Sequence, residues 1–202
     1  MRRLVVGLTG TFGSGKSTVG KILKRFGARK VIDSDLVAHE VFRPGHPAGK
    51  KIRLLFGVKK SISRKVIAKE VFSNPKKRRR LESIIHPYVS QRIAREIGRI
   101  SSGVVILEVP LLFETGFDRF CDVTVAVLTG ERNIVKRLSR VGFKPEEVRA
   151  RLRAQLPERE KKRRADLYIQ NSGSKTLLTQ KTKLIWQKLI SILNEKENLR
   201  GA

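Results

Sequence analysis

Apolar residues along the chain fall into two patterns, and their alternation predicts the fold class. Five short runs centred on apolar residues are typical of strands buried in a parallel sheet. These runs are residues 3–9, 30–33, 104–109, 122–128 and 167–169. Apolar residues also recur at helical spacing, first at Val19, Ile22 and Phe26 and finally over residues 174–193. We therefore expect an α/β fold with a parallel five-stranded sheet flanked by helices.

The first predicted strand leads into a glycine-rich stretch, Gly7-Leu8-Thr9-Gly10-Thr11-Phe12-Gly13-Ser14-Gly15-Lys16-Ser17-Thr18. Gly10, four further residues and then Gly15-Lys16-Ser17 match the P-loop spacing G-x-x-x-x-G-K-[ST]. The glycines let the backbone turn so that N–H groups from Thr11 to Thr18 can converge on phosphate oxygens. Lys16 supplies an ammonium for the β- and γ-phosphates of ATP, and Ser17 a hydroxyl for Mg²⁺. Strand, loop and helix in this order predict the P-loop nucleoside-triphosphate hydrolase fold.

Two stretches interrupt the alternation of strand and helix. Residues 46–100 have helical apolar stripes and no clear strand, so we expect a helical insertion. Within it, Pro75 suits the first turn of a long helix, and Pro87 is expected to kink or break that helix. Residues 131–164 are charged and helical in pattern, which fits either a solvated surface or a mobile arginine-rich lid. The expected nucleotide-binding core is the remainder: 1–45, 101–130 and 165–202.

The charge of the chain is the largest departure from an ordinary composition. The chain has 45 basic and 18 acidic residues, for a net charge of +27. Nucleic acid, small polyphosphates or a basic or thermophilic proteome would each account for it. Cys121 is the only cysteine, so no internal disulfide forms, and its apolar context predicts a buried structural thiol. There is neither a signal-peptide pattern nor an apolar run long enough to cross a membrane, so we expect a cytoplasmic protein.

Carboxylates near the ends of predicted strands are the candidate catalytic groups. Asp33 ends the run 30–33 and is expected at the same rim of the sheet as the P-loop, where it suits a general base or a water-positioning group. Asp35 either caps the next helix or has a functional role. Glu108 and Glu114 are the carboxylates available for the Mg²⁺ shell, although Glu108 fits an outward-facing strand position equally well. His86 precedes a proline, where packing or capping is the commoner role.

Sequences typical of other P-loop proteins do not follow the loop. The GTPase patterns D-x-x-G and N-K-x-D and the transporter pattern L-S-G-G-Q are absent. A small-molecule kinase is therefore the favoured class, and its acceptor does not follow from this reasoning. Two alternatives stay open: a P-loop ATPase that acts with nucleic acid through its basic surface, and a kinase for another small nucleotide-like acceptor.

Six blocks in order carry a resemblance to dephospho-coenzyme A kinases over almost the whole chain. They are the P-loop, D-x-D-x-x-A-H at 33–39, H-P at 86–87, P-L-L-F-E at 110–114, R-x-x-x-Q at 151–155 and A-D-x-x-I-x-N-x-G at 165–173. The chain departs from the family pattern at Phe12, where a small aliphatic residue is usual, at Glu108, and at Val141-Gly142 after Arg140.

The resemblance implies a reaction and a set of roles. ATP and 3′-dephospho-CoA would give ADP and CoA, with Asp33 as the base for the ribose 3′-hydroxyl. The insertion would bind the acceptor, with Asp35 and His86 near it. Arg140 and the segment to about residue 165 would form the lid, and Asn171 would help to form the adenine pocket. The expected partners are therefore these two small molecules and not nucleic acid. We expect the protein to be a monomer or a small homo-oligomer.

Overall fold

The computed structural model describes residues 2–43, 45–58, 67, 70–71 and 74–198. The chain divides into two compact units. One consists of Met1–Ile32 together with Ile97–Ala202, and the other is Asp33–Glu96. The second unit begins at Asp33, so it includes a short helix that the apolar pattern grouped with the core.

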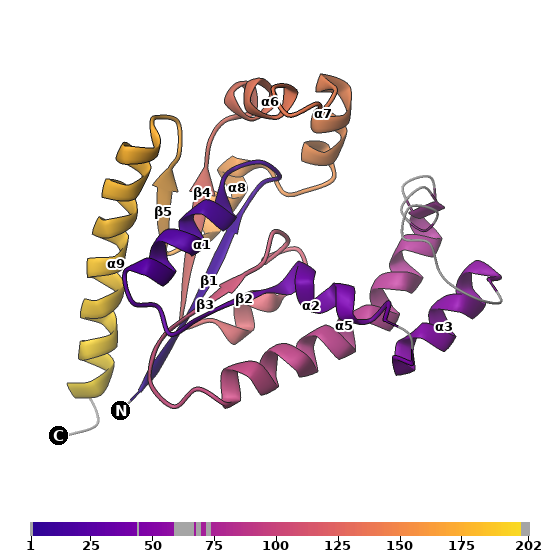
Figure 1. The fold of residues 1–202 in the computed structure, drawn as a ribbon, viewed down its shortest axis with the longest axis horizontal. Helices are drawn as coiled ribbons and strands as arrows, with labels where there is room; N and C mark the ends of the chain where they lie inside the picture. The colour runs from indigo at the N-terminus through magenta and orange to yellow at the C-terminus, as the bar shows by residue number, and fades with distance from the viewer. Residues whose placement is uncertain (1, 44, 59–66, 68–69, 72–73, 199–202) are drawn as a thin grey trace. The chain divides into compact units, whose positions relative to one another are not determined.

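The sheet has five strands in the order β2-β3-β1-β4-β5 (Figure 1). The strands are β1 (Arg3–Gly10), β2 (Lys30–Asp33), β3 (Gly103–Glu108), β4 (Val123–Leu128) and β5 (Leu167–Gln170). The central strand β1 pairs in parallel with β3 and β4, and β4 pairs in parallel with β5. The predicted parallel five-stranded sheet is confirmed. Because β1, β3 and β4 are buried along nearly their whole length, their sequences show no polar alternation.

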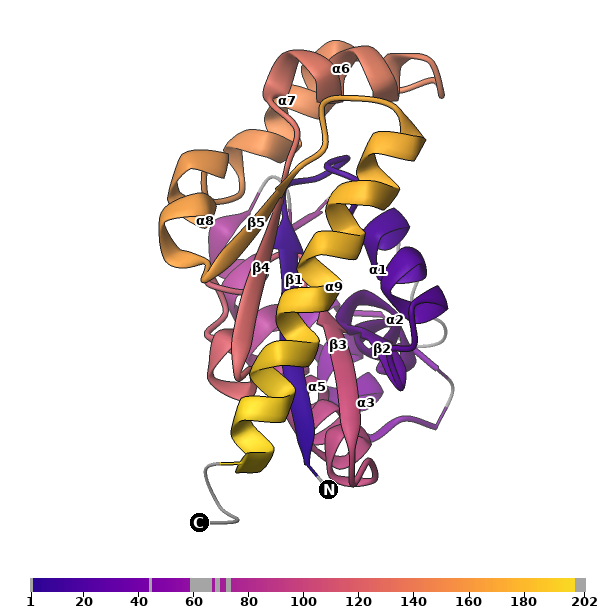
Figure 2. The same ribbon diagram turned by 90° about the vertical axis from the view of Figure 1, so that its left-hand side faces the viewer.

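The helices of the first unit bury apolar side chains against the sheet. They are α1 (Lys16–Arg25), η1 (Phe117–Phe120), α6 (Glu131–Ser139), α7 (Pro145–Arg153), α8 (Glu158–Arg164) and α9 (Lys175–Asn198). Helices α1 and α9 lie side by side along the sheet (Figure 2). Leu23 and Leu189 pack there against Leu4 and Leu8 of β1. Burial of each such side chain contributes about 1.5–3 kcal/mol, and this packing fixes α1 beneath the P-loop.

The second unit contains α2 (Ser34–Glu40), α3 (Pro47–Phe56) and most of α5 (Pro75–Gly98). Its core includes Val41, Ile52 and Leu81. Of the predicted kink or break at Pro87, the break is wrong, because α5 continues through that residue. A proline removes one backbone hydrogen bond of a helix, whereas apolar residues on both sides of it, Leu81 and Val89 among them, are buried and hold the helix together.

A second local prediction also fails: Asp33, not Asp35, caps α2. Oδ1 of Asp33 accepts hydrogen bonds from the N–H groups of Asp35 (2.8 Å) and Leu36 (3.3 Å). The helix begins directly after the strand, so the carboxylate that ends β2 reaches the free N–H groups of the first turn. Asp35 is exposed in that turn.

Candidate active site

The loop between β1 and α1 has the backbone that its glycines predict. Gly13 and Gly15 have φ angles of 75° and 94°, a region that side chains disfavour. A Cβ on Gly13 would lie 2.8 Å from Cδ1 of Leu138, and one on Gly15 would overlap the amide of Asn171. These glycines are therefore required by both backbone conformation and close packing. Thr18 lies in the first turn of α1, where its N–H donates to the Gly15 carbonyl over 3.1 Å.

Lys16 is held within the loop. Its Nζ donates to the carbonyl oxygens of Gly10 (2.9 Å) and Thr11 (3.1 Å), and the residue is buried. These two hydrogen bonds keep the ammonium group beside the loop. A phosphate bound by the loop N–H groups would therefore lie close to Lys16, as the sequence predicts.

Ser17 lies beside the carboxylate that ends β3. Its hydroxyl donates to Oε1 of Glu108 over 2.6 Å, and Glu108 is buried. A Cβ on Gly20 would lie 3.2 Å from Oε2 of the same carboxylate. The absence of a side chain at Gly20 lets the carboxylate lie against α1. Glu108 therefore faces the P-loop helix and is not an outward-facing strand residue.

These oxygen atoms suit Mg²⁺. This ion prefers hard oxygen ligands and is usually held by one or two protein groups together with substrate phosphates and water. Among the described residues, no three His, Cys, Asp or Glu side chains gather as they would around an ion held by protein alone. The Ser17 hydroxyl and the Glu108 carboxylate could therefore supply the protein ligands of a Mg²⁺ ion whose other ligands are phosphate oxygens and water.

The back of the loop is fixed by residues from three other segments. The Ser14 carbonyl accepts hydrogen bonds from the amide of Asn171 (2.7 Å) and the hydroxyl of Thr129 (2.9 Å). Arg137 of α6 donates to the carbonyls of Gly13 (3.5 Å) and Asn171 (3.4 Å). Arg140, singled out by the sequence, is exposed where α6 ends. From the sequence, no role was assigned to Arg137 or to Thr129.

The tip of the loop is bound to the charged segment that follows α6. The N–H of Phe12 donates to Oε1 of Gln155 over 2.9 Å. The Phe12 and Phe143 rings meet edge to face with centroids 5.5 Å apart. The Arg151 guanidinium lies 4.7 Å from the centroid of Phe12 and 5.2 Å from that of Phe143. Phe12, a departure from the family pattern, therefore contacts both Arg151 and Gln155 of the R-x-x-x-Q block.

Glu158, at the start of α8, joins the P-loop to the end of β4. Its carboxylate accepts from the N–H groups of Thr129 and Gly130, each at 2.8 Å, and from the Thr11 hydroxyl at 3.2 Å. A carboxylate that binds several donors of a turn fixes the backbone there. Nothing in the local sequence distinguishes Glu158 from the other acidic residues of this segment.

Lys161 is fully buried and forms an ion pair with Glu114. Its Nζ donates to Oε1 of Glu114 (2.7 Å) and to the Pro110 carbonyl (2.9 Å), and Glu114 also accepts from the N–H of Leu156 (2.9 Å). Burial lowers the pKa of Lys161 below its ordinary value, while Glu114 partly offsets this change. Glu114 therefore fastens α8 to the loop after β3. Of the two carboxylates considered for the Mg²⁺ shell, only Glu108 lies at Ser17.

The remaining predicted residues belong to the second unit. Asp33 ends β2 and caps α2, Asp35 lies in the first turn of α2, and His86 is half-buried in α5.

Cys121, after η1 in the first unit, is half-buried, and burial together with nearby Asp118, Asp122 and Asp166 raises the pKa of its thiol to about 12. Such a thiol stays protonated, in agreement with the structural role expected for it.

Comparison with known proteins decides the family. A family model described as CoaE, dephospho-CoA kinase, matches residues 4–176. The chain belongs to the dephospho-CoA kinase family. The dephospho-CoA kinase of Carboxydothermus hydrogenoformans is 40% identical over 179 residues, which cover 84% of this chain and 86% of that protein. The one from Oryza sativa subsp. japonica is 36% identical over 206 residues, 98% and 89% of the two chains.

Solved structures agree with this membership. TT1252 from Thermus thermophilus has a TM-score of 0.82 at 35% identity, with 94% of this chain and 99% of that chain covered. Dephospho-CoA kinase from Campylobacter jejuni has a TM-score of 0.68 at 25% identity, with 96% and 99% covered. A shikimate kinase from Acinetobacter baumannii, at 17% identity and a TM-score of 0.52 over 93% of both chains, shares the fold alone.

As a dephospho-CoA kinase, the protein is an ATP-dependent transferase, and the resemblance inferred from six sequence blocks is confirmed. Its substrates are ATP and dephospho-CoA. In the described part of the chain, every helix is too short or too polar to cross a lipid bilayer.

Proposed function

We propose that the P-loop, Lys16, Ser17 and Asp33 carry out the transfer of the γ-phosphoryl group of ATP to the ribose 3′-hydroxyl of dephospho-CoA. The products are ADP and CoA. The observation that carries the proposal is the arrangement of Lys16, Ser17 and Glu108 around the start of α1. It combines a loop cation, a hydroxyl and a strand-end carboxylate, which are the parts that P-loop phosphoryl transfer uses.

The loop binds the phosphates of ATP in this proposal. N–H groups from Thr11 to Thr18, at the positive end of the α1 dipole, donate to the phosphate oxygens. Lys16 exchanges the Gly10 and Thr11 carbonyls for the β- and γ-phosphates, and so neutralises charge that develops during transfer. Asn171, which already fixes Ser14, is proposed to border the adenine base.

Magnesium would be held by Ser17, with Glu108 as the carboxylate of its shell. When bound, Mg²⁺ would neutralise charge on the β- and γ-phosphate oxygens. Glu108 orients the Ser17 hydroxyl through the 2.6 Å hydrogen bond. A carboxylate in this position acts on its neighbour and needs no direct contact with substrate.

The acceptor hydroxyl is proposed to lose its proton to Asp33 as the bond to the γ-phosphorus forms. Both described hydrogen bonds to this carboxylate end on Oδ1, and they orient the group without using Oδ2. The insertion, residues 46–100 as first predicted, is proposed to bind dephospho-CoA, with Asp35 and His86 near it. Residues 131–164 are proposed to act as the lid, with Arg140 neutralising phosphate charge.

The direct test is ADP formation by the purified protein with Mg-ATP, with and without dephospho-CoA, and identification of the product by mass. We expect ADP to form with the acceptor and the product to be CoA. ADP formation that ignores the acceptor and rises with nucleic acid would instead favour the nucleic-acid-dependent ATPase. Turnover of other nucleosides at comparable kcat/KM would favour the kinase of another acceptor.

A further inference from the structure

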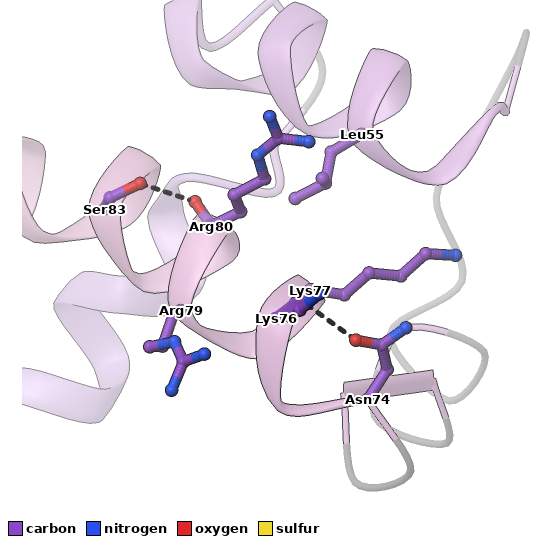
Figure 3. A pocket seen from close by; sticks show the side chains of 7 residues that line it. All are labelled: Leu55, Asn74, Lys76, Lys77, Arg79, Arg80 and Ser83. Atoms are coloured by element: carbon purple, nitrogen blue, oxygen red, sulfur yellow. Dashed lines mark hydrogen bonds between the residues drawn. The ribbon is translucent and has the colours of Figure 1, made fainter.

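A basic cavity in the second unit is not used by the proposed roles. The cavity, of about 610 Å³, is bordered by Lys76, Lys77, Arg79, Arg80 and Ser83 of α5, with Asn74 and Leu55 beside them (Figure 3). The charged side chains come from the first two turns of a single helix. Leu55, from α3, supplies an apolar edge.

Exposed cations gather at the start of this helix, where an anion would be favoured. The first turn of α5 contains no acidic residue, and a helix dipole disfavours cations at this end. Lys77 and Arg78 have acidic partners, because Lys77 pairs with Glu70 at 2.5 Å and Arg78 with Glu82 at 3.7 Å. For Lys76, Arg79 and Arg80, by contrast, no acidic partner occurs among the residues that the structure describes.

Lys76, Arg79, Arg80 and Ser83 form a stripe along α5 that lies on the same side of the helix as His86. Residues 76, 79 or 80, 83 and 86 or 87 succeed one another at three- and four-residue steps, which places them on one side of an α-helix. With a rise of about 1.5 Å per residue, Arg80 lies about 9 Å and Arg79 about 10.5 Å along the axis from His86. Because α5 runs from Pro75 to Gly98, these residues and His86 lie on one helix.

We infer that Lys76, Arg79 and Arg80 bind the diphosphate of the acceptor, a nucleoside diphosphate ester. The inference rests on the proposed function, in which His86 lies near dephospho-CoA. A diphosphate carries two or more negative charges close to the ribose, and guanidinium groups bind phosphate oxygens in pairs. The side chains of Arg79 and Arg80 extend in different directions (Figure 3), so binding draws two exposed side chains together.

The test compares two ligands and two variants of the full chain. Calorimetry without ATP measures the binding of dephospho-CoA and of adenosine, which has the same 3′-hydroxyl and no diphosphate. The double variant Arg79→Gln/Arg80→Gln removes the proposed contacts while glutamine keeps the helix propensity. Arg78→Gln is the matched control, since it removes one charge from the same segment on the opposite side of the helix.

For the double variant we expect the dissociation constant of dephospho-CoA to rise about 10- to 100-fold, the size expected for losing charge-assisted hydrogen bonds. Its affinity for adenosine stays at the wild-type value, and Arg78→Gln binds both ligands as the wild type does. In turnover, KM for dephospho-CoA rises while KM for ATP does not.

Three results would overturn the inference. They are an unchanged affinity for dephospho-CoA, an equal loss for both ligands, and loss of polynucleotide binding with an unchanged KM for dephospho-CoA. The last result would assign the stripe to nucleic acid. Failure of the proposed function is distinguishable, because the wild-type protein itself would then form no ADP in response to dephospho-CoA.

Discussion

The hydroxyl of Ser17 and the carboxylate of Glu108 are 2.6 Å apart, and they join the first turn of α1 to the end of β3. The two residues are far apart in sequence, and parallel pairing of β1 with β3 brings them together. Gly20 gives the carboxylate room here, because a Cβ at this position would lie 3.2 Å from Oε2 of Glu108. A strand-end carboxylate is thereby delivered to the hydroxyl that follows the P-loop lysine.

The first prediction concerns Glu108→Gln. The amide keeps the shape of the side chain and loses the charge that would serve the Mg²⁺ shell. We expect kcat/KM to fall about 10- to 100-fold, as for other groups that orient metal ligands, and the Mg²⁺ concentration for half-maximal rate to rise. Steady-state kinetics over a Mg²⁺ series measure both. An unchanged Mg²⁺ dependence, with the melting temperature preserved, would remove Glu108 from the shell.

The second prediction concerns Asp33→Asn. Asparagine caps helices about as well as aspartate, so the start of α2 should survive the change. If the carboxylate is the general base, kcat falls about 10²- to 10⁴-fold while KM for ATP changes little. Asp118→Asn is the matched control, because Asp118 is an exposed aspartate of η1 with no proposed role in the site. Comparable kcat values for the two variants would argue against the assignment of Asp33.

Local sequence predicted much of the fold because most elements here are specified by adjacent residues. The unbroken apolar runs predicted the five strands, and the P-loop spacing placed the turn between β1 and α1. Pro87 misled the prediction because a proline's local cost was weighed without the buried residues on either side of it. Asp35 misled it because the helix begins one residue after the strand ends, which moves the cap to Asp33.

The site was predicted less completely, since its contacts depend on pairing between distant segments. Lys16 and Ser17 are readable from a motif, whereas Glu158 and Arg137 reach the loop only through tertiary packing. Lys161 stands in a run of charged residues that looks solvated, and its burial follows from Glu114, far away in sequence. The sequence marked Glu114 only as a candidate for the Mg²⁺ shell and as the last residue of the P-L-L-F-E block, and neither indicated a contact with Lys161.

The third prediction concerns the contacts at the tip of the P-loop. Phe12→Ala removes one of the two rings against Arg151 and leaves the hydrogen bond from the residue 12 N–H to Gln155 possible. Cation–π contacts contribute about 0.5–2 kcal/mol each, so we expect faster amide exchange in α7 with little change in global stability. Hydrogen exchange measures this directly. Arg153→Ala is the control, since Arg153 is exposed at the end of the same helix.

For turnover, a looser α7 predicts a higher KM for ATP in Phe12→Ala if this segment closes over the nucleotide. The same change in Phe143→Ala would assign the effect to the ring pair and not to the P-loop backbone. Protection of α7 that equals the wild type in both variants would show that these rings do not hold the segment.

The last prediction concerns the ion pair that the fully buried Lys161 forms with Glu114. Lys161→Met leaves Glu114 without its cation. The expected cost is below the roughly 3–5 kcal/mol of breaking a fully buried pair, because the Glu114 side chain is 18% exposed. Adding Glu114→Gln should recover most of that loss, because no unpaired charge remains and the amide oxygen can still accept from Leu156.

The pair of Lys161 and Glu114 also predicts that stability depends on pH. Burial lowers the pKa of Lys161 below 10.5, so between the lowered pKa and 10.5 the unfolded chain binds more protons than the native one. The free energy of unfolding contributed by Lys161 therefore rises with pH across that alkaline window, and Lys161→Met lacks the rise. Denaturant unfolding at several pH values tests both statements, and a single variant as stable as the wild type would contradict the first.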